Sequence, residues 1–220
     1  MHSLSRSTKI SLLITLALLL IAAAVTFVLI NQRDTERQAA TDGGAQVLRE
    51  NSHRLDIGSP DGPVLVEFLD FECESCAAAY PFVEELRDTY AGDLTYVIRY
   101  FPIPSHQNSM TAALAVEAAA QQGELEGMYR MMFETQLQWG EQTASQAPLF
   151  RSYAETLGLD LGAFDASVAD PATEERVRQD FDEGLQLGVD ATPTFFLDGQ
   201  RVEVASLDEF RSLVDDAVNE

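Results

Sequence analysis

The sequence predicts an α/β domain, a small sheet with an inserted helical subdomain, preceded by one N-terminal transmembrane helix. Three observations lead to this fold class. A strand, a helix and a second strand follow one another at the start of the domain. A long helical block then covers about residues 106–187. A hairpin pattern and one more helix end the chain, so that strands from both ends of the domain can share one sheet.

Residues 10–30 are 21 consecutive residues without a charged side chain. At about 1.5 Å per helical residue, they reach across a hydrocarbon core of roughly 30 Å. We expect an uncleaved membrane anchor, and a cleaved signal peptide is the alternative. Arg6 and Lys9 favour a cytoplasmic location for residues 1–9, so the domain that follows is expected on the extracytoplasmic side of the cell membrane.

Residues 31–57 are polar and contain the pair Gly43-Gly44, which predicts a linker. The globular domain is expected to cover residues 58–220, because a cluster of turn-forming residues lies at 58–63.

The run Val64 to Leu69 predicts a buried strand, and Leu94 to Phe101 predicts a second one. A helix is expected between them, from about Cys73 to Tyr90, because apolar side chains recur along it every three residues. Within the helical block, Pro171 suits the first turn of the last helix and Gly188 suits its end.

Two further patterns complete the domain. Residues 194–197 and 201–204 are joined by an Asp-Gly turn, which predicts a two-stranded hairpin. Ser206 followed three residues later by Glu209 predicts a capping box at the start of a closing helix that ends near Val218.

The chain is strongly acidic, with 14 Lys and Arg against 36 Asp and Glu and a net charge of −22. Residues 31–220 contain no lysine. This field repels nucleic acid and anionic lipid, so no nucleic-acid partner is expected. An acidic surface increases solubility, and it also suits a salt-rich environment, where repulsion between the acids is screened.

The only two cysteines, Cys73 and Cys76, lie three residues apart where a strand ends and a helix begins. Free N–H groups at a helix start favour a thiolate on the first cysteine, and the spacing allows a disulfide. We therefore predict a redox pair, in which an exposed Cys73 attacks and Cys76 resolves the mixed disulfide. Two structural thiols are the alternative. A metal site needs more ligands than this pair, so neither a metal nor a cofactor is expected.

Four segments resemble the DsbA-like thiol–disulfide oxidoreductases, and in particular their membrane-anchored members. They are Val64 to Cys76, Arg99 to His106, Gly123 to Gln136 and Gly188 to Phe196, and the resemblance extends over roughly residues 58–218. It implies a thioredoxin fold with an inserted helical subdomain, in agreement with the order of elements above.

The resemblance also implies roles for individual residues. Pro193 matches a cis-proline loop beside the cysteines, where the backbone of Thr192 would pair with an extended substrate segment. Glu67 matches a buried acid that exchanges a proton with Cys76; an edge-strand acid that faces water is the alternative. His106 matches a family histidine, for which we expect a structural role.

The dipeptide Glu74-Ser75 between the cysteines departs from the proline or histidine of many relatives. A carboxylate next to Cys73 opposes its thiolate, and a less stable thiolate makes a weaker oxidant. These two residues are therefore expected to tune the redox pair.

The sequence predicts an enzyme that introduces disulfides into exported proteins. A reductase or isomerase on the same fold is the first alternative, and a redox-inert binding module anchored at the membrane is the second. The expected partners are exported proteins with thiols or disulfides, together with a membrane redox partner that resets the dithiol.

Overall fold

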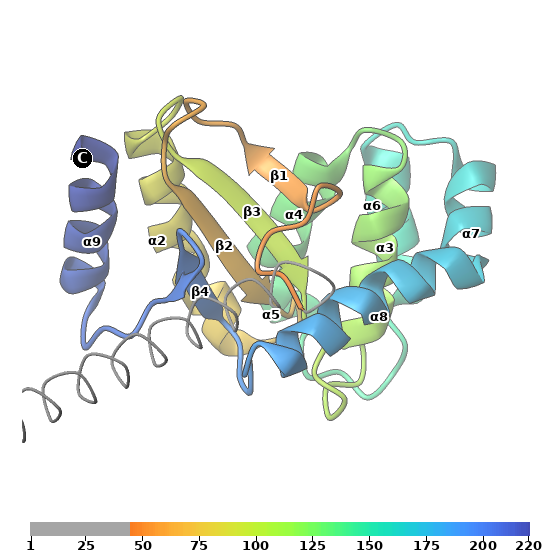
Figure 1. The fold of residues 1–220 in the computed structure, drawn as a ribbon. Coiled ribbons are helices and arrows are strands. Elements are labelled where there is room, and N and C mark those ends of the chain that lie inside the picture. Colours follow the sequence, from red (N-terminus) through yellow and green to blue (C-terminus); the bar gives the residue numbers. More distant parts are fainter. Residues whose placement is uncertain (1–44) are drawn as a thin grey trace, which may run out of the picture. The chain divides into compact units, whose positions relative to one another are not determined.

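A five-stranded mixed sheet forms the centre of the domain in the computed structural model, which describes residues 45–220 (Figure 1). The spatial order of the strands is β1-β3-β2-β4-β5. The central strand β2 runs parallel to β3 and antiparallel to β4. The strands are β1 (His53–Asp56), β2 (Val64–Leu69), β3 (Thr95–Tyr100), β4 (Thr194–Leu197) and β5 (Gln200–Arg201).

The helices fall into two groups. Helix α2 connects the parallel strands β2 and β3, and α9 ends the chain beside α2 (Figure 1). The six others are inserted between β3 and β4, and α3 contacts four of them, α4, α6, α7 and α8. The helices are α2 (Glu74–Thr89), α3 (Ser109–Ala120), α4 (Leu125–Glu134), α5 (Gln136–Trp139), α6 (Ala147–Thr156), α7 (Leu161–Ala169), α8 (Pro171–Gln186) and α9 (Leu207–Asn219).

Each face of the sheet supports its own apolar core, because successive side chains of a strand point to opposite faces. Leu65 and Leu69 of β2 join the larger core, which includes both cysteines and the buried face of α2. Val66 and Phe68 belong to a smaller core on the other face. Glu67 lies between Leu65 and Leu69 in this alternation, so it points toward the cysteines.

The predicted ends of three helices agree with the structure. Pro171 is the first residue of α8, and Gly188 ends that segment with a φ of 81°, a value that favours glycine. The Ser206 hydroxyl accepts a hydrogen bond from the Glu209 N–H at 3.2 Å, which caps α9. Helix α2 begins directly after Cys73.

The structure differs from the sequence prediction in two places. Strand β1 lies within residues 31–57, which were expected to be a linker, and it pairs antiparallel with β3. Its sequence, HRLD, has a single apolar residue, Leu55, so no apolar alternation predicts a strand there. Strand β5 is shorter than expected, although the N–H of Val202 still donates to the carbonyl of Phe195 at 2.9 Å.

The predicted N-terminus (residues 1–9) and membrane anchor (residues 10–30) lie outside the described residues, as does most of the predicted linker. Among residues 45–220, no helix combines the length and the apolar character that a membrane crossing requires.

Candidate active site

The dithiol lies where the loop after β2 enters α2. Cys73 is the N-cap residue of α2 and has an extended backbone, so its side chain lies at the helix end where the N–H groups of the first turn have no partner within the helix. Cys76 follows in that first turn. Both cysteines are free thiols. Cys73 is less exposed than predicted, with 7% of its surface accessible, because the helical insertion and the proline loop both approach it; Cys76 is 1% exposed.

The surroundings of Cys73 stabilise its thiolate. Hydrogen bonds from the Cys76 thiol and from the backbone N–H groups of Cys76 and Ser75 lower the pKa of Cys73 to about 5, although burial opposes this shift. At neutral pH the sulfur therefore carries a negative charge, which is the form that attacks disulfides. Glu74 and Ser75 are exposed in the first turn of α2, so solvent screens the charge of Glu74.

The surroundings of Cys76 have the opposite effect. Burial, the interaction with Cys73 and the charge of Glu67 raise the pKa of the Cys76 thiol well above its usual range. The two sulfurs of one motif thus differ in protonation at neutral pH. Cys76 needs a base before it can act as a nucleophile.

Glu67 is the acid whose charge acts on Cys76. It lies on the central strand β2, between β3 and β4, and only 2% of its surface is exposed, so it is not the water-facing acid of an edge strand. The hydroxyl of Tyr96 donates a hydrogen bond to its Oε2 atom. Burial raises the pKa of Glu67 to about 8, although the bond from Tyr96 lowers it and nearby Cys73 contributes to the rise.

The loop before β4 lies against the dithiol. The peptide bond between Thr192 and Pro193 is cis, as the resemblance implied. The Sγ atom of Cys73 lies 3.4 Å from the Thr192 carbonyl oxygen. The structure thus brings together residues that are separated by more than a hundred positions in the sequence.

Two buried acids before Cys73 fix the active-site loop, and sequence reasoning missed both. Asp70 accepts hydrogen bonds from the N–H of Glu72 at 2.9 Å and of Ile103 at 3.0 Å. It also contacts His106 Nδ1 at 2.7 Å, which supports the structural role expected for that histidine. The Glu72 carboxylate accepts a bond from the Asn108 N–H at 2.5 Å. A usable signal was present, because an acid within or directly after a buried strand needs partners.

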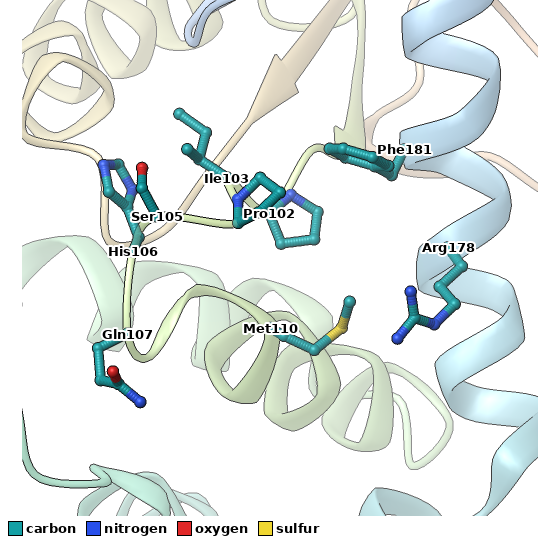
Figure 2. Close-up of a pocket in the computed structure, with 9 residues that line it drawn as sticks. Pro102, Ile103, Ser105, His106, Gln107, Met110, Arg178 and Phe181 are labelled. Carbon is teal, nitrogen blue, oxygen red and sulfur yellow. The ribbon is translucent and has the colours of Figure 1, made fainter.

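Two adjacent cavities line the approach to this loop. The first, of about 490 Å³, exposes Cys73 among mainly polar side chains and has acidic walls at Glu72, Glu74 and Glu141. The second, of about 360 Å³, shares residues 105–107 with the first. Figure 2 shows Arg178 and Phe181 of α8 on the opposite side of this second cavity from the 102–107 loop. Within residues 45–220, no group of three or more His, Cys, Asp or Glu side chains is arranged to hold a metal ion.

The fold and the dithiol at the start of α2 together define a protein of the thioredoxin class. Residues 50–216 match the family model described as Thioredoxin, so the chain belongs to the thioredoxin family.

Solved structures share the fold. A thioredoxin-like oxidoreductase from Silicibacter pomeroyi DSS-3 is 25% identical, with a TM-score of 0.64 over 80% of this chain and 97% of that one. Alpha-DsbA1 from Wolbachia pipientis is 20% identical, with a TM-score of 0.67 over 78% of this chain and 93% of that one. The predicted DsbA-like thioredoxin fold is therefore confirmed.

Curated relatives with similar sequences are longer proteins. Na(+)/H(+) antiporter NhaA 1 from Mycobacterium sp. strain KMS is 39% identical over 150 residues, which are 66% of this chain and 23% of the relative. Na(+)/H(+) antiporter NhaA from Herminiimonas arsenicoxydans is 39% identical over 138 residues, 63% of this chain and 21% of the relative. The chain thus spans less than a quarter of the length of either relative.

Proposed function

We propose that this protein is a thiol–disulfide oxidoreductase that introduces disulfides into exported proteins through Cys73 and Cys76. The opposite protonation preferences of the two sulfurs support this function best. A stabilised Cys73 thiolate is a good leaving group, so the reduced enzyme is stable and its disulfide is oxidising. The protonated and buried Cys76 does not compete for substrate.

The proposed reaction begins with the oxidised pair. A substrate thiolate attacks Cys73, the bond between Cys73 and Cys76 breaks, and its electron pair goes to Cys76. Glu67, which is mostly protonated at neutral pH, gives its proton to the Cys76 thiolate. A second substrate thiolate then attacks the substrate sulfur of the mixed disulfide. Cys73 leaves as a thiolate, and the substrate keeps the new disulfide.

The loop at Thr192 and Pro193 is the proposed substrate-binding element. Because the Thr192 carbonyl lies beside Cys73, a substrate strand that pairs with this backbone brings its own cysteine near the sulfur. The acidic walls of the adjacent cavity favour polar or basic substrate segments over acidic ones.

We place the domain outside the cytoplasm, anchored by residues 10–30, with a membrane redox partner that reoxidises the dithiol. The uncharged 21-residue segment and the need for an oxidising compartment support this location. We do not propose antiport for this chain, because the matched segment covers less than a quarter of the length of the antiporter. Membrane fractionation should recover the intact chain with the membranes; a soluble product that begins near Val25 would instead indicate a cleaved signal.

The reduction potential tests the direction of the reaction. Equilibration with glutathione should give a value between those of thioredoxin and DsbA, about −270 and −120 mV, because the pKa of Cys73 lies between the values of roughly 7 and 3.5 in those proteins. A value at or below that of thioredoxin would favour the reductase. If the dithiol does not exchange with glutathione at all, the protein is a redox-inert binding module rather than an oxidoreductase.

Replacement of the resolving cysteine should trap substrates. The variant Cys76→Ser keeps the Cys73 nucleophile but cannot break a mixed disulfide, so covalent complexes with thiol proteins should accumulate on non-reducing gels. Cys73→Ser is the matched control and should form none. If alkylation of the reduced wild type at neutral pH modifies Cys76 before Cys73, the roles are reversed.

A further inference from the structure

The substrate thiol that attacks the oxidised pair is mostly protonated at neutral pH. A free cysteine thiol has a pKa of about 8.5, so only about 3% of it is thiolate at pH 7. The acidic wall of the 490 Å³ cavity beside Cys73, formed by Glu72, Glu74 and Glu141, further disfavours the entry of an anion. A substrate thiol therefore enters this cavity in its neutral form and must lose its proton there.

His106 is the side chain of this wall that is best suited to take that proton. The other titratable groups of the wall are three glutamates and Cys73, which is part of the disulfide at this step. An imidazole is a stronger base than a carboxylate, and it exchanges protons near neutral pH. The His106 side chain is 31% exposed, so a proton that it takes up can pass to water.

A buried acid determines which nitrogen of His106 is available. Nδ1 lies 2.7 Å from Oδ2 of Asp70, whose side chain is fully buried. The N–H groups of Glu72 and Ile103 also donate to Asp70, at 2.9 and 3.0 Å. These bonds favour the ionised carboxylate, although burial raises the pKa of Asp70.

Because a carboxylate only accepts, Nδ1 carries the hydrogen of the neutral ring and the free lone pair is on Nε2. Within residues 45–220, no group forms a hydrogen bond with Nε2. The contact with Asp70 thus accounts for one ring nitrogen and leaves the other able to act as a base.

The loop after β3 carries His106 to the cavity that Cys73 also lines. In Figure 2, the ring lies at the end of the loop that is remote from Arg178 and Phe181. Helix α3 adds only the uncharged Met110 to the adjacent cavity. The titratable or charged groups around His106 are Asp70, Glu72, Cys73 and Glu74 from the segment that joins β2 to α2, Glu141 from the loop after α5, and Arg178 of α8, which is paired with Glu174 at 2.7 Å.

We propose that Nε2 of His106 is the general base that removes the proton of the substrate thiol, a role that rests on the proposed function. The S–H bond of the substrate breaks, its proton moves to Nε2, and the substrate sulfur bonds to Cys73. The bond between Cys73 and Cys76 breaks, and its electron pair goes to Cys76, which takes the proton of Glu67. The imidazolium then releases its proton to water. Asp70 is the positioning residue of this base.

The pH dependence of the first step tests the base in the wild-type enzyme. Between pH 9 and pH 7, the thiolate fraction of a cysteine peptide with blocked ends falls about 25-fold. The initial rate of mixed-disulfide formation with oxidised enzyme should fall only about two- to threefold, because the neutral thiol also reacts. The reference is 4-nitrothiophenol, which is ionised throughout this range, so the ratio of the two rates cancels the titration of Glu67. Acid quenching and mass spectrometry measure both rates.

The variant His106→Asn removes Nε2 and keeps an amide N–H near the position of Nδ1 for the bond to Asp70. With the cysteine peptide, we expect a rate about tenfold below wild type at pH 7 and close to wild type at pH 9. With 4-nitrothiophenol, the rate should equal that of wild type at both pH values.

The matched control is His53→Gln. His53 lies in neither cavity and contacts the acid Glu117 through Nε2 at 2.6 Å, a contact that the glutamine amide can keep. This variant should react like wild type with both thiols.

Three results would overturn the base: a wild-type rate that follows the thiolate fraction, a His106→Asn rate lowered equally for both thiols or at both pH values, or an equal loss in His53→Gln. The second of these would leave His106 with a structural role only. Because the first measurement uses the wild type alone, it decides even if the variant does not fold. A wild-type enzyme that forms no mixed disulfide with either thiol overturns the proposed function itself, and this role with it.

Discussion

At the scale of single residues, the chemistry depends on what surrounds two cysteines and one acid. Cys73 and Cys76 are separated by one helical turn, but Cys73 receives hydrogen bonds at the helix start, whereas Cys76 faces Glu67 in the core. Glu67 itself is an acid that burial keeps protonated. Each of these states also changes the stability of the fold, because the same groups titrate at ordinary values in the unfolded chain.

Glu67 and Cys73 should make opposite contributions to the pH dependence of stability. The folded pKa of Glu67 is raised from 4.5 to about 8, so its contribution is complete below pH 4.5 and is lost as pH rises toward 8. The folded pKa of Cys73 is lowered from 9.0 to about 5, so its contribution is complete above pH 9 and is lost as pH falls toward 5. Between pH 5 and 8 the two effects largely cancel in the reduced wild type.

Single variants should reveal each contribution. Relative to wild type, Glu67→Gln should gain stability as pH rises from 5 to 8, by on the order of 3 kcal/mol, and Cys73→Ser should lose a similar amount. Urea unfolding of the reduced proteins at several pH values measures both. Parallel stability curves for wild type and Glu67→Gln would mean that the carboxyl titrates at the same pH in folded and unfolded chains.

The sequence was informative where a residue type is restricted by its position. An acid inside an apolar strand and a proline before a strand both pointed to the site, and the structure places Glu67 and Pro193 where the resemblance implied. The partner of Glu67, Tyr96, could not be predicted, because buried tyrosines are common and only the pairing of β2 with β3 brings this hydroxyl to the carboxylate.

At the scale of elements, strands β2 and β3 and helix α2 follow directly from apolar periodicity. Strand β1 does not, because its pairing depends on contacts made elsewhere. The segment before it is held by Arg49, which contacts Asp180 and lies 3.2 Å from Glu183 of α8. Such an edge strand is specified by long-range ion pairs rather than by its own apolar pattern.

Asp180 should be the most sensitive charged residue of this arrangement. It is fully buried on α8, and its carboxylate lies 2.5 Å from Arg99 and 2.7 Å from Arg176, in addition to Arg49. Asp180→Asn removes the negative charge that three arginines share, and we expect a loss of about 3–5 kcal/mol in the free energy of unfolding.

The matched control is Asp182→Asn, an exposed acid on the same helix, which should change stability by less than about 0.5 kcal/mol. Urea unfolding measures both variants. Equal small losses would show that the arginines find other partners, for example Glu183, once Asp180 is neutral.

At the scale of the whole molecule, the order of elements predicts one small sheet with a helical insertion, because a strand, helix, strand and late hairpin leave few ways to build one sheet. The resemblance, rather than this order, implied the thioredoxin fold. The internal arrangement of the insertion was less accessible. Helix α8 has 16 residues, and Pro171 and Gly188 predict its ends. The other five helices have only 4 to 12 residues, so their boundaries depend on packing around α3 rather than on periodicity.

The net negative charge of the whole chain should make the stability of the fold depend on salt concentration. With 36 acids against 14 basic residues, the compact state brings like charges close together, whereas the unfolded chain separates them. Added salt shortens the screening length from about 30 Å at 0.01 M to about 3 Å at 1 M, so it should relieve this repulsion. Exposed pairs such as Arg151 and Asp165, at 2.8 Å, weaken with salt, but each contributes little.

The melting temperature should therefore rise with sodium chloride, and most of the rise should occur below about 0.5 M, where screening changes most strongly. Exclusion of salt from the protein surface also stabilises folded chains, but this effect keeps growing at higher concentration, and sulfate enhances it. Thermal scans in chloride and in sulfate at equal ionic strength separate the two causes. Screening depends only on ionic strength, so the melting temperatures in the two salts should coincide at low ionic strength. They should diverge only at high ionic strength, where exclusion of salt from the protein surface dominates. A melting temperature that stays flat or falls below 0.5 M would mean that attractive ion pairs outweigh the repulsion of the net charge.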